Sequence, residues 1–165
     1  MKKKYPPLRK RDIAEILRSP EMQESKNHVH HGEVSVYSHS VSVAKHSYRF
    51  ARMLEKSLGV KFNKLSLVRG ALLHDFFQYD WHDDWDLLHG WKHPRAALKN
   101  ADELFDLTLR ERDIIRKHMW PMTLLNFPTC REAWLVCFAD KYCSLLETFK
   151  VYKYNFHDDG HGDDS

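Results

Sequence analysis

The amino-acid sequence predicts an all-α fold: a compact bundle of about six to eight helices that forms a single domain over residues 1–165. Three observations favour this class. Apolar residues recur at spacings of three and four along most of the chain, which is the period of an amphipathic helix. The 6 glycines and 6 prolines are too few for the many turns of an all-β protein. Helix-capping residues precede several apolar segments, and 165 residues is a usual length for one domain.

The first third of the chain predicts two short helices and one long one. A helix is expected over 12–18, and Ser19 followed by a proline predicts the cap and first position of a second helix. Residues 28–33 break the pattern and are expected to form a loop. A long helix is predicted over 36–58, where apolar stripes on two faces indicate a central helix. Gly59 is its natural C-terminal stop.

The remaining elements follow from caps and breaks in the pattern. Asn63 is expected to cap a helix that ends near residue 74. Residues 76–91 are aromatic and acidic without a clear period, and so long an irregular segment usually has a function. Further helices are predicted over 94–105, 108–118 and 129–150. Capping boxes open the last two, Thr108 with Glu111 and Thr129 with Glu132.

Composition and charge exclude several protein classes. The net charge of +3 and the scattered arginines do not indicate a nucleic-acid partner. No stretch approaches the ~18 apolar residues of a membrane span, and the basic start is not followed by the apolar core of a signal peptide. The 3 cysteines lack a Cys-x-x-Cys pair, which indicates the reducing cytoplasm rather than a disulfide framework. The polar residues 156–165 are expected to form a flexible tail.

Ionisable residues on apolar helices are the main clue to function, in a chain with 12 histidines. Asp140 lies on the predicted helical face that also carries residues 133, 136, 137, 144 and 147. His74 and Asp75 end an apolar helix, and His39 lies on an inner stripe. A buried carboxylate needs a counter-charge or a metal ion. Taken singly, each has a simpler explanation: a buried ion pair, a solvated helix end and a hydrogen-bonded core histidine.

His93 and His118 are predicted at a helix start and a helix end. Pro94 follows the first and Pro121 lies just beyond the second, and prolines at helix ends help to hold neighbouring side chains in place. The simpler interpretation is that both are surface imidazoles at helix termini.

In their order along the chain, these residues resemble the HD-domain superfamily of metal-dependent phosphohydrolases. The segments that carry the resemblance are 37–44 (YSHSVSVA), 71–75 (ALLHD), 92–94 (KHP), 114–118 (IIRKH) and 138–141 (FADK). The resemblance covers about residues 34–147 and implies the all-helical fold of that family. It also implies a hydrolase that cleaves a phosphoester with a metal-activated water.

The resemblance implies a ligand set for one or two divalent ions. One ion would be held by His39, His74, Asp75 and Asp140. His93 and His118 would complete a second site, which Asp75 would share as a bridging ligand. Mixed imidazole and carboxylate ligands suit Mn, Fe, Co, Ni or Zn.

Two residues are candidates for a catalytic role. The first is Asp75, through its position between the ions. The second is Lys141, next to Asp140, whose ammonium can pair with a phosphate oxygen. For Lys141, a surface position or a salt bridge to a ligand carboxylate is an equal alternative.

The substrate is less well determined than the site. A small-molecule phosphoester, a nucleotide among the options, is the expected partner, and a homodimer is left open. Candidate substrate contacts are His31, Tyr79, His82 and His89, against the alternative of solvated loops or a self-packed lid. No Gly-Tyr-Pro signature supports a cyclic dinucleotide. Two other functions remain open: a two-iron oxygenase of the same superfamily, and a non-catalytic metal-stabilised ligand-binding module.

Overall fold

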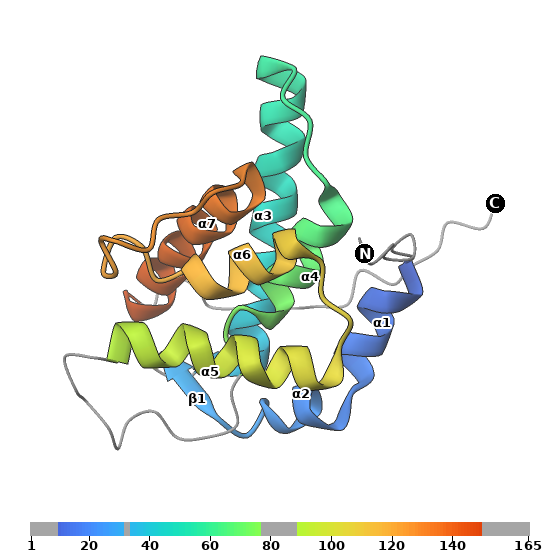
Figure 1. The fold of residues 1–165 in the computed structure, drawn as a ribbon, viewed down its shortest axis with the longest axis vertical. Helices are drawn as coiled ribbons and strands as arrows, with labels where there is room; N and C mark the ends of the chain where they lie inside the picture. The colour runs from blue at the N-terminus through green and yellow to red at the C-terminus, as the bar shows by residue number, and fades with distance from the viewer. Residues whose placement is uncertain (1–9, 32–33, 77–88, 150–165) are drawn as a thin grey trace, which may run out of the picture.

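The computed structural model describes residues 10–31, 34–76 and 89–149. These ranges contain seven helices and one short pair of antiparallel strands, which confirms the predicted all-α class (Figure 1). The elements are α1 (Lys10–Arg18), α2 (Pro20–Glu24), β1 (Val29–His31), β2 (Val34–Ser35), α3 (Val36–Leu58), α4 (Lys64–Leu73), α5 (His89–Leu104), α6 (Leu109–Lys117) and α7 (Arg131–Thr148). The tail at 156–165 lies outside the described residues.

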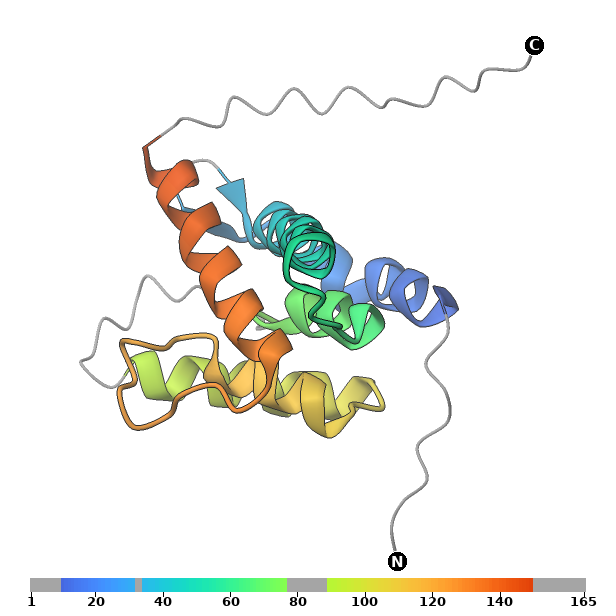
Figure 2. The same ribbon diagram turned by 90° about the horizontal axis from the view of Figure 1, so that it is seen from above.

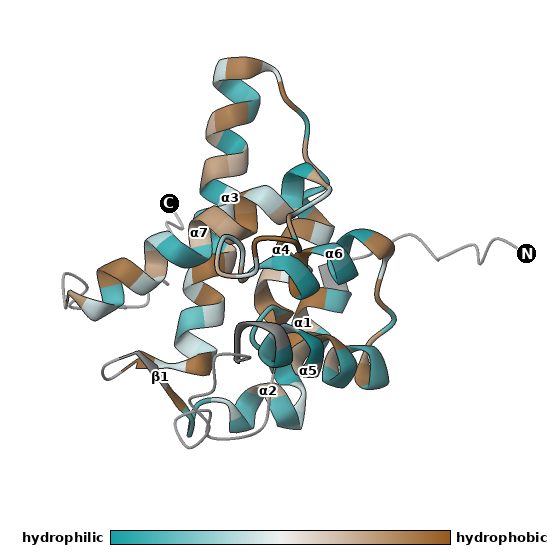
Figure 3. Cartoon of the chain, turned by 60° about the vertical axis from the view of Figure 1, so that its left-hand side comes forward, coloured by the Kyte–Doolittle hydropathy of each residue, from teal (hydrophilic) through white to brown (hydrophobic). Residues whose placement is uncertain are grey.

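The long helix α3 lies at the centre over residues 36–51, as its two apolar stripes predict, and its last turns project from the body (Figure 1). It packs against α4 on one side and α7 on another, and α6 contacts both α4 and α7. Seen from above, α7 and α1 lie on opposite sides of the body (Figure 2). Brown, apolar segments recur on these helices (Figure 3). Fully buried core side chains come from most of them: Ile16, Val43, Ala51, Leu67, Leu73, Ile114 and Val136. None of the described helices has the length and apolar content needed to cross a bilayer.

Three of the predicted caps form as expected. The side chains of Ser19 and Asn63 accept hydrogen bonds from backbone amides in the first turns of α2 and α4. Thr108 and Glu111 form the predicted capping box at the start of α6. Gly59 ends α3 with a φ of 67°, a left-handed conformation that favours glycine. Local sequence alone therefore places these helix ends.

Two predicted boundaries are wrong. Residues 28–33 are not simply a loop, because Val29–His31 pairs with Val34–Ser35. Helix α5 begins at His89 rather than at Pro94, so the segment expected to be irregular is shorter than 76–91. A proline in the second turn removes a single backbone hydrogen bond, and a 16-residue helix survives that loss.

The capping box predicted at Thr129 is also wrong. Helix α7 is capped by Cys130, which makes no side-chain capping bond. The carboxylate of Asp113 instead accepts hydrogen bonds from the amides of both Thr129 and Cys130, and from the Thr129 hydroxyl at 2.7 Å. Glu132 accepts a hydrogen bond from the backbone amide of Asn63 at 2.7 Å. Thr129 and Glu132 therefore bond residues outside their own turn, and the capping box does not form.

We expect Gly70→Ala to lower the free energy of unfolding by about 1–3 kcal/mol, the usual cost of overpacking. A Cβ at Gly70 would lie 2.6 Å from Cδ1, 2.9 Å from Cγ2 and 3.0 Å from Cβ of Ile114. The last atom is bonded to the backbone of α6, so α4 and α6 must separate. Urea denaturation measures the effect.

Gly59→Ala is the matched control for this change. A Cβ there meets no atom within 4 Å, so only the left-handed backbone is strained. Gly59→Ala should leave the metal content unchanged. Gly70→Ala should lower the metal content, because it separates α4 and α6, whose C-terminal caps are His74 and His118. Unchanged stability of Gly70→Ala would contradict the close packing of α4 on α6.

Candidate metal centre

The structure brings the six predicted ligand residues together from five helices. His39 lies in the first turn of α3, and Asp140 lies midway along α7. His74 and His118 are the C-terminal caps of α4 and α6, and His93 lies in α5. The exposed fractions are 0% for His39 and His74, 1% for His118, 3% for Asp75, and 5% for His93 and Asp140. The C-terminal ends of α4 and α6 therefore place the imidazoles of His74 and His118 in the core.

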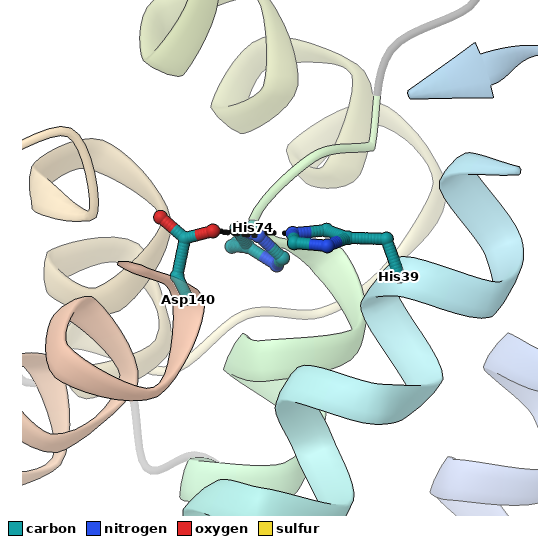
Figure 4. Close-up of side chains that lie close together, drawn as sticks. All are labelled: His39, His74 and Asp140. Carbon is teal, nitrogen blue, oxygen red and sulfur yellow. Dashed lines mark hydrogen bonds and ion pairs between the residues drawn. The ribbon is translucent and has the colours of Figure 1, made fainter. Parts of the chain in front are cut away.

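His39, His74 and Asp140 form the first of two triads whose ligand atoms lie within 4.8 Å of one another. Oδ1 of Asp140 is 3.1 Å from Nε2 of His39 and 3.6 Å from Nε2 of His74 (Figure 4). Ligands at about 2.0–2.2 Å from one ion lie roughly 3.0–3.6 Å apart. The spacing of this triad therefore suits a divalent ion.

Asp75, His93 and His118 form the second triad. Oδ1 of Asp75 is 2.8 Å from Nε2 of His93 and 3.2 Å from Nε2 of His118. The other oxygen, Oδ2, faces the first triad, at 3.3 Å from Nε2 of His74 and 3.7 Å from Nε2 of His39. Asp75 thus directs one oxygen toward each triad, which is the geometry of a bridging carboxylate.

Hydrogen bonds at Nδ1 orient three of the four imidazoles. His74 donates to the carbonyl of Ala71 at 2.8 Å, and His118 donates to that of Ile115 at 2.7 Å. His39 donates to Oε2 of Glu147 at 2.8 Å. In each case the acceptor holds the Nδ1 proton and directs Nε2 toward the centre, as in known metal-binding histidines.

Glu147 is the residue that sequence reasoning missed. Its place on the helical face of Asp140, seven residues away, was a visible signal, but no role followed from it. The structure places it 4% exposed against His39, in the same helix as Asp140. It fixes the ring that Asp140 also contacts.

We expect Glu147→Gln to weaken metal binding by about 10- to 100-fold, the usual effect of removing an acceptor behind a metal-binding histidine. Competition with a chromogenic chelator measures it. Glu132→Gln is the matched control, because Glu132 is also in α7 and 4% exposed but bonds Asn63. Equal metal affinity for Glu147→Gln and the unmodified protein would contradict a role for this carboxylate.

The surroundings of His118 indicate that His118 and Asp75 suit a bound cation. Burial lowers the pKa of His118 against the opposing effect of Asp75, so its imidazole is neutral at neutral pH. Since Nδ1 carries the proton that Ile115 accepts, Nε2 presents a lone pair and has no hydrogen-bond partner. That lone pair faces the Asp75 carboxylate at 3.2 Å. Two acceptors so close repel each other, and a cation between them removes the repulsion.

The first triad is electrostatically tuned by its own carboxylates. Burial lowers the pKa of His39, but hydrogen bonds to Asp140 and Glu147 outweigh it and raise the pKa to about 9. Burial likewise opposes the rise for His74, where Asp75 and Asp140 raise the pKa to about 10. Burial raises the pKa of Asp140, yet Lys141 and the two imidazoles hold it well below its usual range. Without metal, protons on His39 and His74 neutralise the carboxylates.

We expect the apparent metal affinity to rise by up to about 100-fold per pH unit between pH 6.5 and 9, because the ion displaces two protons. Calorimetry in buffers of different ionisation enthalpy counts the protons released. The metal-free protein should behave oppositely. Stability from the protonated imidazoles is fully present below pH 6.5 and is lost as the pH rises through about 9 and 10.

A metal affinity that does not change over this pH range would contradict the raised pKa values of His39 and His74. The comparison is made at constant ionic strength, so that only protonation changes.

Lys141 occupies the salt-bridge position that was one of its predicted alternatives. Its ammonium donates to Oδ2 of Asp140 at 2.7 Å and to the carbonyl of His118 at 2.6 Å, and its side chain is 32% exposed. It therefore links the C-terminal end of α6 to the middle of α7 beside the triads.

The predicted substrate contacts are not placed. Tyr79 and His82 lie outside the described residues. His31 ends β1 and His89 begins α5, but their side chains are outside what the structure describes.

In a comparison with known protein families, residues 36–145 match the family described as HD domain. The matched range runs from the first residue of α3 to near the end of α7, and it contains both triads. Neither a curated protein nor a solved structure matches the chain.

Proposed function

Since the chain belongs to the HD-domain family, we propose that it is a metal-dependent phosphohydrolase that cleaves a phosphoester of a small molecule. The observation that carries the proposal is the position of Asp75, whose two oxygens face different histidine pairs. A carboxylate in that position suits a site for two ions, which is a common arrangement for hydrolysis at phosphorus.

The ligand set divides between the two triads. His39, His74 and Asp140 would hold one ion, and His93 and His118 the other, with Asp75 shared between them. Bound there, divalent ions of the Mn, Fe, Co, Ni or Zn type supply a Lewis acid for a phosphoryl oxygen and lower the pKa of the attacking water.

The protein's own groups have three tasks in this proposal. Burial of the six ligands excludes bulk water and strengthens their electrostatic interactions with a phosphate. Acceptors at Nδ1 hold the imidazoles in one orientation. Lys141, whose side chain is 32% exposed beside Asp140, would pair with a non-reacting phosphate oxygen. His31, Tyr79, His82 and His89 stay proposed substrate contacts.

The test combines metal analysis of the purified protein with a phosphoester screen under each of the five divalent ions. We expect bound metal and turnover of at least one nucleotide or sugar phosphate. Lys141→Met should raise KM more than it lowers kcat if the ammonium binds phosphate, and Lys99→Met, on the exposed face of α5, is the control.

Two results would overturn the proposal. Oxygen consumption by the iron-loaded protein with no phosphoester cleaved would indicate the oxygenase alternative. Tight binding of metal and ligand with no turnover would indicate a non-catalytic module.

A further inference from the structure

Helix α7 is apolar on the side that faces solvent as well as on the side that faces the core. Five side chains along its outer face, here called the α7 stripe, are well exposed: Trp134 44%, Phe138 60%, Tyr142 38%, Leu145 59% and Phe149 72%. The inner face is also mainly apolar around Asp140 and Glu147. A helix that is apolar all round is normally buried on all sides.

Charged residues do not interrupt the stripe. Lys141 lies between its members in sequence, but its ammonium turns to Asp140 and the carbonyl of His118. Asp140 and Glu147 are each at most 5% exposed. Between Trp134 and Leu145, the well-exposed positions of α7 are therefore aromatic or aliphatic.

The apolar surface continues beyond α7 at both sides. The Trp120 ring lies 4.9 Å from that of Trp134, in the connection between α6 and α7. That connection exposes four more large apolar side chains: Met122 68%, Leu124 73%, Leu125 88% and Phe127 55%. On the other side, Phe50 of α3 contacts Phe138 and Tyr142, with ring centroids 5.6 Å apart in each pair. The rings of the stripe are thus held in place before any partner binds.

We propose that the α7 stripe is the interface of a homodimer, in which the α7 helices of two copies pack antiparallel across a twofold axis near Tyr142. The spacing of the stripe lets a second copy match it residue for residue. Its intervals of four, four, three and four residues are nearly the same read from either end. In an antiparallel pair Trp134 faces Phe149, Phe138 faces Leu145, and Tyr142 lies near its own copy, as an isologous interface requires.

The exposed area is large enough for such an interface. With about 150–250 Å² for each aromatic side chain, the exposed part of the stripe is roughly 500 Å² per copy. Adding the apolar side chains of the 119–127 connection brings this to roughly 900 Å², against about 800 Å² per partner in a standard interface. Antiparallel helix dipoles add a small favourable term.

The first test is the mass in solution by light scattering over a range of concentrations. The full chain should have twice the mass of 19.7 kDa, and Phe138→Glu should halve it. Leu58→Glu is the control: Leu58 is 68% exposed at the far end of α3 and should leave the dimer intact. Metal content should not change in either variant, because the stripe lies on the face of α7 opposite Asp140.

Cysteine cross-linking tests the antiparallel arrangement. Tyr142→Cys should form a disulfide between two copies on oxidation, because the axis brings the two positions together. Trp134→Cys should not do so alone, but should cross-link when mixed with Phe149→Cys. The unmodified chain, in which Cys137 and Cys143 are buried and Cys130 is half-buried, controls for native thiols.

Three outcomes would overturn the proposal. The first is a monomer at every concentration whose Tm is unaffected by Phe138→Glu. The second is a monomer whose Tm falls in that variant, since the stripe would then be covered by the chain's own residues. The third is a dimer that survives Phe138→Glu and is not cross-linked through Tyr142→Cys.

Discussion

Asp75→Ala is expected to remove most of the bound metal and to lower the rate of phosphoester hydrolysis by more than about 100-fold, since loss of even an outer partner of a ligand costs 10- to 100-fold. Among the described residues, Asp75 is the side chain with one oxygen directed at each triad, 2.8 Å from His93 and 3.3 Å from His74. Alanine supplies neither oxygen, and no other carboxylate among the described residues is placed against both histidine pairs.

The measurements for Asp75→Ala are metal content by mass spectrometry and initial rate at saturating substrate. Asp113→Asn is a matched control. The Asp113 carboxylate accepts a hydrogen bond from the amide of Thr129, just before α7, and pairs with Lys117 at 2.7 Å, but it belongs to neither triad. It should lose stability but keep metal. His161→Ala, in the tail, should change neither. Full metal occupancy with the unmodified rate in Asp75→Ala would refute the bridging role.

His93→Ala and His118→Ala are each expected to reduce the metal content from two ions to one per chain and to cut the rate strongly, while the fold survives. Both imidazoles direct Nε2 at the same oxygen of Asp75, at 2.8 Å and 3.2 Å. The first triad does not include either residue and should keep its ion. Native mass spectrometry counts the ions, and circular dichroism checks the fold.

Two results would change the interpretation of these histidines. If the unmodified protein binds one ion even in excess metal, yet both variants lose activity, the histidines contact substrate phosphate instead. If both variants keep full activity, the two-metal proposal is wrong. Neither result would bear on the first triad, so the two halves of the site are tested separately.

Local signals in the sequence were sufficient for several helix ends. Ser19, Asn63 and Thr108 each cap a helix through a hydrogen bond to an amide three residues later, so neighbours in sequence contain the whole interaction. The capping box predicted at Thr129 is wrong because its side chain bonds a residue distant in sequence. Its competing partner is Asp113, 16 residues away, and only the packing of α6 beside α7 brings them together.

The start of α5 shows a different limit. Proline is a strong signal for a helix start and predicts one at Pro94, but Pro94 lies inside the helix. The prediction that His93 is held at a helix terminus was therefore wrong. The imidazole is positioned by a helix that begins four residues earlier and by its contact with Asp75.

The sequence by itself determined the composition of the site. The order of His39, His74, Asp75, His93, His118 and Asp140 along the chain resembles the HD-domain family, and that resemblance implied which side chains gather. Helical periodicity contributed the buried or exposed face of each residue, but it did not identify the ligands.

Only the tertiary structure determined how those side chains are oriented and which atoms face one another. Which nitrogen of His39 faces the centre depends on Glu147, 108 residues away, and which oxygen of Asp75 meets which histidine depends on how α4, α5 and α6 end against one another. Periodicity specifies a face of a helix but not a ring orientation. Side-chain torsions are set by contacts between helices that are distant in sequence, and those contacts exist only once the bundle is assembled.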